Sequence, residues 1–247
     1  MEKNKKKRNK NEKKHFEKED LKEKKETEYI ELKKEKIKLK KYSLGEELMS
    51  AITHGIGAGL SITALVLCII AGARHGAINV ISGIIYGISL IILYTMSTLY
   101  HSFKPNLAKK VFRVFDHCCI FLLIAGTYTP FTLITLNGIN GWIIFTVIWA
   151  CAILGIVFNS INLEKFKKIS FILYLIMGWT VLVDIKSLIA NLDPTGLKLL
   201  VVGGITYTLG ALVYLVGHKV KYMHSIWHFF VLTASVLHFF CIFLYVL

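Results

Sequence analysis

Seven long apolar stretches, separated by short polar connections, dominate the pattern of this chain after residue 42. Each stretch holds about 20 residues or more, the length that an α-helix needs to cross the hydrocarbon core of a bilayer. Because the connections are short, neighbouring segments are expected to pack side by side. The pattern predicts an all-α integral membrane protein, a seven-transmembrane helix bundle, with segments over residues 47–72, 77–101, 114–136, 141–160, 169–190, 198–217 and 224–246.

The composition agrees with this class of protein. Hydrophobic residues make up 54% of the 247 positions, more than a soluble domain carries. The five cysteines all fall inside apolar segments and form no CxxC pair, so we expect small hydrophobic residues rather than disulfides or a thiolate zinc site. Pro130 is expected to kink the third segment, because proline cannot donate a backbone hydrogen bond.

Charge is concentrated before the first apolar segment. The first 41 residues hold 18 of the 30 Lys and Arg and 10 of the 16 Asp and Glu, with few apolar positions. We therefore predict a disordered basic tail over residues 1–42, followed by a membrane domain over residues 43–247. The tail either contacts anionic lipid head groups or is a solvated flank that fixes orientation. No nucleic-acid motif accompanies the net charge of +14, and no nucleic-acid partner is expected.

The loops between the segments predict the orientation of the chain. The connections at 102–113, 161–168 and 218–223 carry nine Lys and Arg, whereas the opposite connections carry only Arg74 and Lys198. Cytoplasmic loops are enriched in Lys and Arg. We therefore expect the amino terminus in the cytoplasm and the carboxy terminus outside, in a multi-pass protein of the plasma membrane.

Candidate chemistry gathers at the predicted cytoplasmic ends of three segments. His224 and His228 are four residues apart, so on a helix they share one face. Ser97 and His101 form a similar pair at the end of the second segment, and Asp116 lies at the start of the third. Three histidines and a carboxylate at one depth favour a metal site, with zinc preferred over copper, nickel or iron. The alternative is a set of hydrogen-bonded interfacial histidines.

These residues resemble those of a known family. The pattern SxxxH before a short loop, an Asp at the start of the next segment and HxxxH at the start of the last are similar to the hemolysin III and adiponectin-receptor family. The stretches EELMSAITHGIGAG and SFKP are closest to its bacterial branch. The family is grouped with the alkaline ceramidases. The resemblance covers about residues 43–247 and implies zinc ligands His101, His224 and His228, with Asp116 and Ser97 beside the metal water.

Three functions are compatible with these residues. A zinc ion held by three histidines suits hydrolysis of a lipid amide or ester, with the substrate bound within the helix bundle. In that hypothesis Asp116 and Ser97 are catalytic, and a ceramide-like amide is suggested by the resemblance alone. The alternatives are a membrane-homeostasis regulator or sensor with structural zinc, and a pore-forming cytolytic protein. The sequence does not separate enzyme from regulator, because both use the same residues.

Other polar residues near the segments receive weaker assignments. His54 is expected to have a structural or supporting role beside the metal site rather than to be a ligand, with Glu46 or Glu47 near the mouth of the cavity. His238 lies about 15 Å beyond His228 along a helix and is expected to be a hydrogen-bonded interior histidine. His117 points away from Asp116 and is expected to be structural.

Overall fold

The computed structural model describes residues 19, 24, 39, 42–217 and 220–247. The chain divides into two units, Met1–Lys40 and Lys41–Leu247, and every helix discussed below belongs to the second unit. The predicted disorder and lipid contact of the tail fall outside the described residues, apart from three isolated positions.

The second unit is helical throughout. By length and composition, six helices in the described part of the chain are long and apolar enough to cross a membrane. Their bounds lie close to the predicted segments, so the all-α, multi-pass class is confirmed. The elements are α2 (Leu44–Gly72), α3 (Ala77–Ser102), α4 (Leu107–Pro130) with the π-helical turn η1 (Phe131–Thr135), α5 (Gly138–Trp179), the 3-10 turn η2 (Thr180–Asp184), α6 (Ile185–Asn191), α7 (Pro194–Val216) and α8 (Met223–Tyr245).

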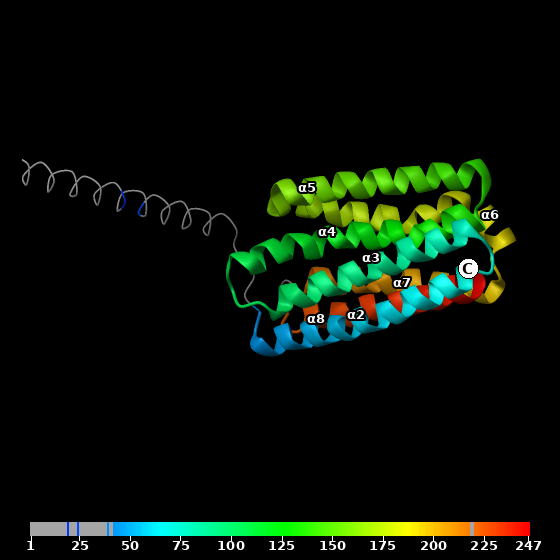
Figure 1. The fold of residues 1–247 in the computed structure, drawn as a ribbon. Helices are drawn as coiled ribbons and strands as arrows, with labels where there is room; N and C mark the ends of the chain where they lie inside the picture. Colours follow the sequence, from blue (N-terminus) through cyan, green and yellow to red (C-terminus); the bar gives the residue numbers. More distant parts are fainter. Residues whose placement is uncertain (1–18, 20–23, 25–38, 40–41, 218–219) are drawn as a thin grey trace, which may run out of the picture. The chain divides into compact units, whose positions relative to one another are not determined.

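The longest continuous stretch, Gly138–Asn191, folds back on itself at Asn162, whose backbone is non-helical (φ −161°, ψ 93°). The side chain of Asn159 accepts a hydrogen bond from Ser170 at 2.6 Å and donates one to Tyr174 at 3.3 Å. In a straight helix Asn159 and Tyr174 would lie about 22 Å apart. The two arms are therefore antiparallel neighbours, as Figure 1 shows, and they correspond to the fourth and fifth predicted segments.

The helix ends follow from local sequence. Ser43 caps α2 in a capping box, in which its hydroxyl accepts from the Glu46 backbone and the Glu46 carboxylate accepts from the Ser43 backbone. Asn106 caps α4 by accepting from the Lys109 N–H at 2.9 Å. At Pro130 α4 ends and the chain continues as the π-helical turn η1, with helical backbone angles at Pro130 and Phe131. The kink expected at this position stays a prediction.

The helices form a closed arrangement around a central cavity. Going around it, α2 packs on α3, α3 on α4 and α4 on α5, while α7 packs on α8 and α8 returns to α2. The approach of α3 to α2 is close at Gly87, where a Cβ atom would lie 2.8 Å from the Cα of Leu65.

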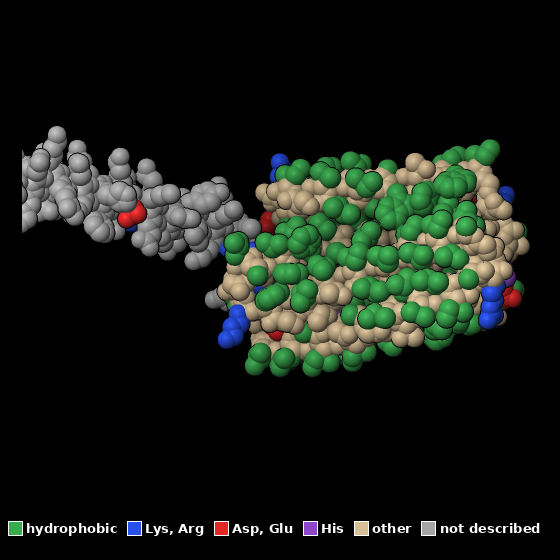
Figure 2. Space-filling model, viewed as in Figure 1, with side chains coloured by type: hydrophobic (Ala, Val, Ile, Leu, Met, Phe, Trp, Pro, Cys, Tyr) green, Lys and Arg blue, Asp and Glu red, His purple; other side chains and the backbone are tan. Residues whose placement is uncertain are grey.

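The outer surface of the bundle is apolar along its length. Figure 2 shows hydrophobic side chains over the lateral face and charged side chains at its two ends. Large aliphatic side chains on this surface, such as those of Ile52 (60% exposed) and Leu212 (54% exposed), would be unusual in contact with water. A lipid environment explains them, and the protein is a multi-pass membrane protein.

Candidate metal centre

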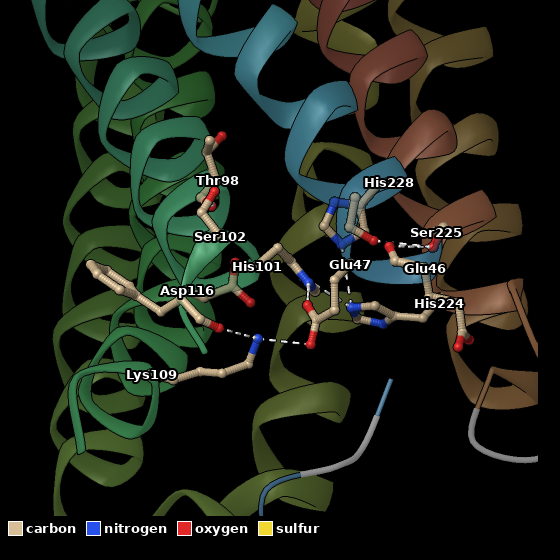
Figure 3. A network of polar contacts seen from close by, with 12 residues as sticks. Glu46, Glu47, Thr98, His101, Ser102, Lys109, Asp116, His224, Ser225 and His228 are labelled. Atoms are coloured by element: carbon tan, nitrogen blue, oxygen red, sulfur yellow. Dashed lines mark hydrogen bonds and ion pairs between the residues drawn. The ribbon is translucent and has the colours of Figure 1, made fainter. Parts of the chain in front are cut away.

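Three buried imidazoles meet at one end of the bundle. The Nε2 atom of His224 lies 3.4 Å from that of His101 and 3.3 Å from that of His228. One ring nitrogen from each of the three residues lies within 4.8 Å of the other two. Figure 3 shows the side chains converging from α3 and α8. The three predicted ligands therefore lie together, although His101 and His224 are 123 residues apart in the chain.

The spacing of these nitrogens fits a tetrahedral metal ion. Zinc–nitrogen bonds of 2.0–2.1 Å at tetrahedral angles place the ligand nitrogens about 3.3 Å apart. The two Nε2 to Nε2 distances from His224, 3.3 and 3.4 Å, agree with this value, and all three ligand nitrogens lie within 4.8 Å of one another. A shared cation also explains why three imidazole nitrogen atoms are buried so close together.

The position of α8 depends on a strained residue and a carboxylate. Tyr222, directly before α8, has a left-handed backbone (φ 65°), which costs a non-glycine residue about 1–3 kcal/mol. Its N–H donates to Glu46 Oε1 at 3.0 Å, so the first turn of α2 stabilises this conformation. The Ser225 hydroxyl donates to the Glu46 carbonyl at 3.0 Å. These contacts fix the start of α8, and with it His224 and His228.

The adjacent carboxylate, Glu47, contacts the other helix that carries a ligand. Its Oε2 lies 2.7 Å from Nδ1 of His101, and its Oε1 accepts from Lys109 Nζ at 2.7 Å (Figure 3). The Lys109 ammonium also donates to the Phe103 carbonyl at 3.0 Å. Sequence reasoning placed Glu47 only near the mouth of the cavity and missed both partners. An acidic residue at a helix start and a lysine-rich loop on the same predicted side indicate an ion pair such as Glu47–Lys109, but they do not indicate the contact with His101.

Asp116 and Ser97 are both buried near this end. Asp116, on α4, is 4% exposed, lines the central cavity and points toward the histidine group in Figure 3. Its Oδ2 lies 3.7 Å from Nδ1 of His117, which is also 2.9 Å from the Arg113 carbonyl. Ser97 lies one turn before His101 on α3, and its hydroxyl is buried without a hydrogen-bond partner.

His54 lies against the metal centre without belonging to the three-histidine group. Its ring is 3.8 Å from that of His228, centroid to centroid, and forms an edge contact of 4.9 Å with Tyr94. Both ring nitrogens of His54, the Ser97 hydroxyl and Nδ1 of His228 are buried without hydrogen-bond partners. Each such atom costs about 1–3 kcal/mol if nothing satisfies it. Buried polar atoms without partners are typical of a site that holds a ligand or water.

Aromatic rings close the site on its other sides. Tyr42 stacks on His224 with a centroid distance of 4.7 Å and an interplanar angle of 22°. Trp227 makes an edge contact of 5.0 Å with His228. Burial holds the pKa of the Tyr42 phenol well above its usual range, so the stacked ring stays neutral. The histidine group is thereby shielded from bulk water.

An apolar cavity of about 180 Å³ begins beside this group. His54, Asp116 and Trp227 line its near end, and His238 and Tyr128 line its far end. The distance from Trp227 to His238 along α8 is about 16 Å. Most other lining residues are aliphatic or aromatic, among them Leu93, Ile120, Ile124, Phe171, Leu175 and Val231. His238 contacts the Leu200 carbonyl at 3.2 Å, which confirms it as a hydrogen-bonded interior histidine.

Fold and site define a class: a multi-pass helical membrane protein with a buried three-histidine group beside an apolar cavity. The family model described as Haemolysin-III related matches residues 42–239, and the chain belongs to this family. The resemblance inferred from the sequence is confirmed.

Relatives of the chain cover nearly all of its membrane domain. Hemolysin-3 of Bacillus cereus is 48% identical over 203 residues, which span 82% of this chain and 92% of that protein. The Hemolysin-3 homolog of Bacillus subtilis (strain 168) is 42% identical over 205 residues, 83% and 96% of the two chains. The Monocyte to macrophage differentiation factor of Homo sapiens is 31% identical over 166 residues, 65% and 68%. No solved structure matches the chain.

The site geometry predicts the effect of removing one imidazole. His228→Ala is expected to abolish binding of one equivalent of zinc by the purified protein, because two ligands cannot complete the tetrahedral set. The same variant should lose the rise in melting temperature that zinc gives to the unaltered protein. Elemental analysis and thermal unfolding in detergent measure both effects. His238→Ala, a buried histidine on the same helix, is the matched control and should retain one equivalent of zinc. Undiminished zinc in His228→Ala would contradict the assignment.

Proposed function

We propose that this protein is a zinc-dependent hydrolase that cleaves an acyl amide or ester bond of a membrane lipid at the cytoplasmic side of the plasma membrane. One observation carries the proposal: three buried imidazoles, with Nε2 of His224 3.4 and 3.3 Å from those of His101 and His228, lie beside one end of a long apolar cavity inside the bundle. An acyl chain in that cavity would bring its polar linkage next to the three histidines.

Zinc is the proposed metal because the candidate ligand set consists of three imidazoles whose nitrogen atoms lie within 4.8 Å of one another. When bound, zinc polarises a carbonyl oxygen and makes a nearby water acidic enough to attack at neutral pH. Three protein ligands leave the fourth position free, as catalytic rather than structural sites require.

Asp116 and Ser97 are proposed to act on the reacting groups. The buried Asp116 carboxylate would orient the attacking water and accept its proton at Oδ1 or Oδ2. The Ser97 hydroxyl, which lacks a protein partner, would donate to the oxygen on which negative charge develops. The proton held by Asp116 would then pass to the leaving amine or alcohol.

The cytoplasmic location rests on charge and on the reversal at Asn162. When the two arms of Gly138–Asn191 are counted separately, the bundle has seven apolar segments. An odd number of spans would put the amino and carboxy termini on opposite sides of the membrane. The end that holds the histidines also carries most of the described lysine and arginine side chains, in the connections around 102–113 and 161–168. Positive-inside bias then places the amino terminus and the site in the cytoplasm.

A regulatory role with structural zinc is the second candidate. It is favoured by the fact that the three ligands come from α3 and α8, so a bound ion would join helices far apart in the chain. A pore-forming, cytolytic role has less support, because the cavity lining is mainly apolar. Hydrolysis of a lipid substrate by the purified protein distinguishes the enzyme from both alternatives, because neither a regulator nor a pore requires it.

Asp116→Asn is expected to lower the rate of fatty-acid release from lipid amides or esters by about 10²–10⁴-fold, since it removes the general base. Zinc content should stay at one equivalent, because Asp116 is not in the three-histidine group. Mass spectrometry of products from a panel of such lipids measures the rate. Asp193→Asn, an exposed carboxylate that caps α7, is the matched control and should keep full activity. Absence of turnover by zinc-loaded, unaltered protein on the whole panel would favour the regulatory role.

Filling the cavity should impair turnover without touching the metal. Gly204 lines the cavity, and a Cβ atom there would have no neighbour within 4 Å, so leucine can enter open space. Gly204→Leu is expected to lower turnover of long-chain substrates by about tenfold or more while zinc content is unchanged. Gly59→Leu, on the exposed face of α2 with equally open surroundings, is the control. Equal turnover in the two variants would show that substrates bind elsewhere.

The orientation predicts the behaviour of reporter fusions. A phosphatase that is active only outside the cytoplasm should be active when fused after Leu247 and inactive when fused after Asn162. The reverse pattern would place the histidine group on the outer side and contradict the cytoplasmic site.

A further inference from the structure

The histidine ring at position 101 has a defined partner on each side. Its Nε2 faces the shared centre, 3.4 Å from Nε2 of His224, and its Nδ1 lies 2.7 Å from Oε2 of Glu47. The two nitrogens of an imidazole point in divergent directions, so the carboxylate cannot itself be a ligand to a metal at that centre. Glu47 instead contacts the far side of a ligand.

The chemistry of this contact fixes where the proton of His101 lies. The Glu47 carboxylate, paired with the Lys109 ammonium through its other oxygen at 2.7 Å, can only accept hydrogen bonds. The proton of a neutral His101 must therefore be on Nδ1, which leaves the lone pair of Nε2 directed at the shared centre. A carboxylate partner also makes the imidazole a stronger donor to a metal.

Glu47 is itself held in place from several directions. The Lys109 side chain is 2% exposed, and its ammonium is fixed between Glu47 and the Phe103 carbonyl. Glu47 lies in the first turn of α2, where the helix dipole favours a negative charge. Its neighbour Glu46 turns instead to Tyr222 and the start of α8. The two carboxylates thus contact different helices, and of the two only Glu47 contacts the side chain of a candidate ligand.

We infer that Glu47 is a positioning residue of the metal centre: it selects the Nδ1–H tautomer of His101, orients the ring and thereby sets the affinity for the ion, with Lys109 holding the carboxylate. The inference rests on the proposed zinc site. In this arrangement α3 and α8 carry the histidines, α2 contributes Glu47, and α4 contributes Lys109.

The test measures zinc affinity of the full chain in detergent by competition with a chelator of known affinity. Glu47→Ala should bind zinc about 10–100-fold more weakly, the loss typical for removal of a carboxylate behind a ligand histidine. Glu47→Gln, which keeps an oxygen acceptor, should recover part of this loss. Glu164→Gln is the matched control, because Glu164 pairs with Arg113 on the same side of the bundle without contact to a histidine ligand. It should remain within about twofold of the unaltered protein.

A second measurement separates positioning from general stabilisation. Two-bond ¹H–¹⁵N spectra of the metal-free, histidine-labelled protein should show His101 as the Nδ1–H tautomer, and Glu47→Ala should convert it to a mixture. Lys109→Met, which removes the ammonium that pairs with Glu47 and leaves the Glu47 carboxylate, should weaken zinc binding less than Glu47→Ala. Unaltered affinity and tautomer in Glu47→Ala, with zinc still lost in His228→Ala, would overturn the role of Glu47 alone. Failure of the unaltered protein to bind zinc would overturn the site itself.

Discussion

The three-histidine group depends on two adjacent carboxylates at the start of α2. Glu46 contacts the start of α8, and Glu47 contacts α3. Glu46 and Glu47 point about 100° apart on a helix. The first stabilises the left-handed Tyr222 and so the start of α8, while the second accepts from His101 on α3. The helices that carry the ligands are therefore aligned through a third helix that carries none. A buried metal site inside a membrane bundle needs such an alignment, because lipid gives helices little hydrophobic reason to choose one register over another.

Burying so many polar groups around the three histidines costs folding free energy, and this cost points to a bound ligand. Three imidazoles, the Glu46 and Asp116 carboxylates and the Lys109 ammonium are withdrawn from water at one end of the bundle, together with the Ser97 hydroxyl and the ring of His54. Polar groups in such surroundings destabilise a fold unless each finds a partner. Some of them are satisfied within the protein, as at Glu47. Others, among them both ring nitrogens of His54, Nδ1 of His228 and the Ser97 hydroxyl, have no partner within the protein, which is typical of a region where a ligand or water binds.

Much of this was predictable from the sequence, for identifiable reasons. Apolar runs and their length predicted the helices, and the i, i+4 spacing of His224 and His228 placed both on one face of the last helix. His101 was expected to lie near them, because helix ends on one side of a membrane lie at one level. The contact of Glu47 with His101 was not predictable in this way, since nothing in the sequence shows which of two neighbouring carboxylates faces α3. The contact between the His54 and His228 rings also depends on the rotation of α2 about its axis, which the hydrophobic pattern alone does not determine.

The same helix, α8, carries two of the three histidines in its first turns and lines the cavity as far as His238, about 15 Å beyond His228. A molecule lying along it would be held by one rigid element at both its polar and its apolar end. The length of acyl chain that fits along α8 would then determine which bond of the lipid lies level with the imidazoles. Selection among lipids by chain length would thus be a property of the spacing between residues of one helix and would need no separate recognition loop.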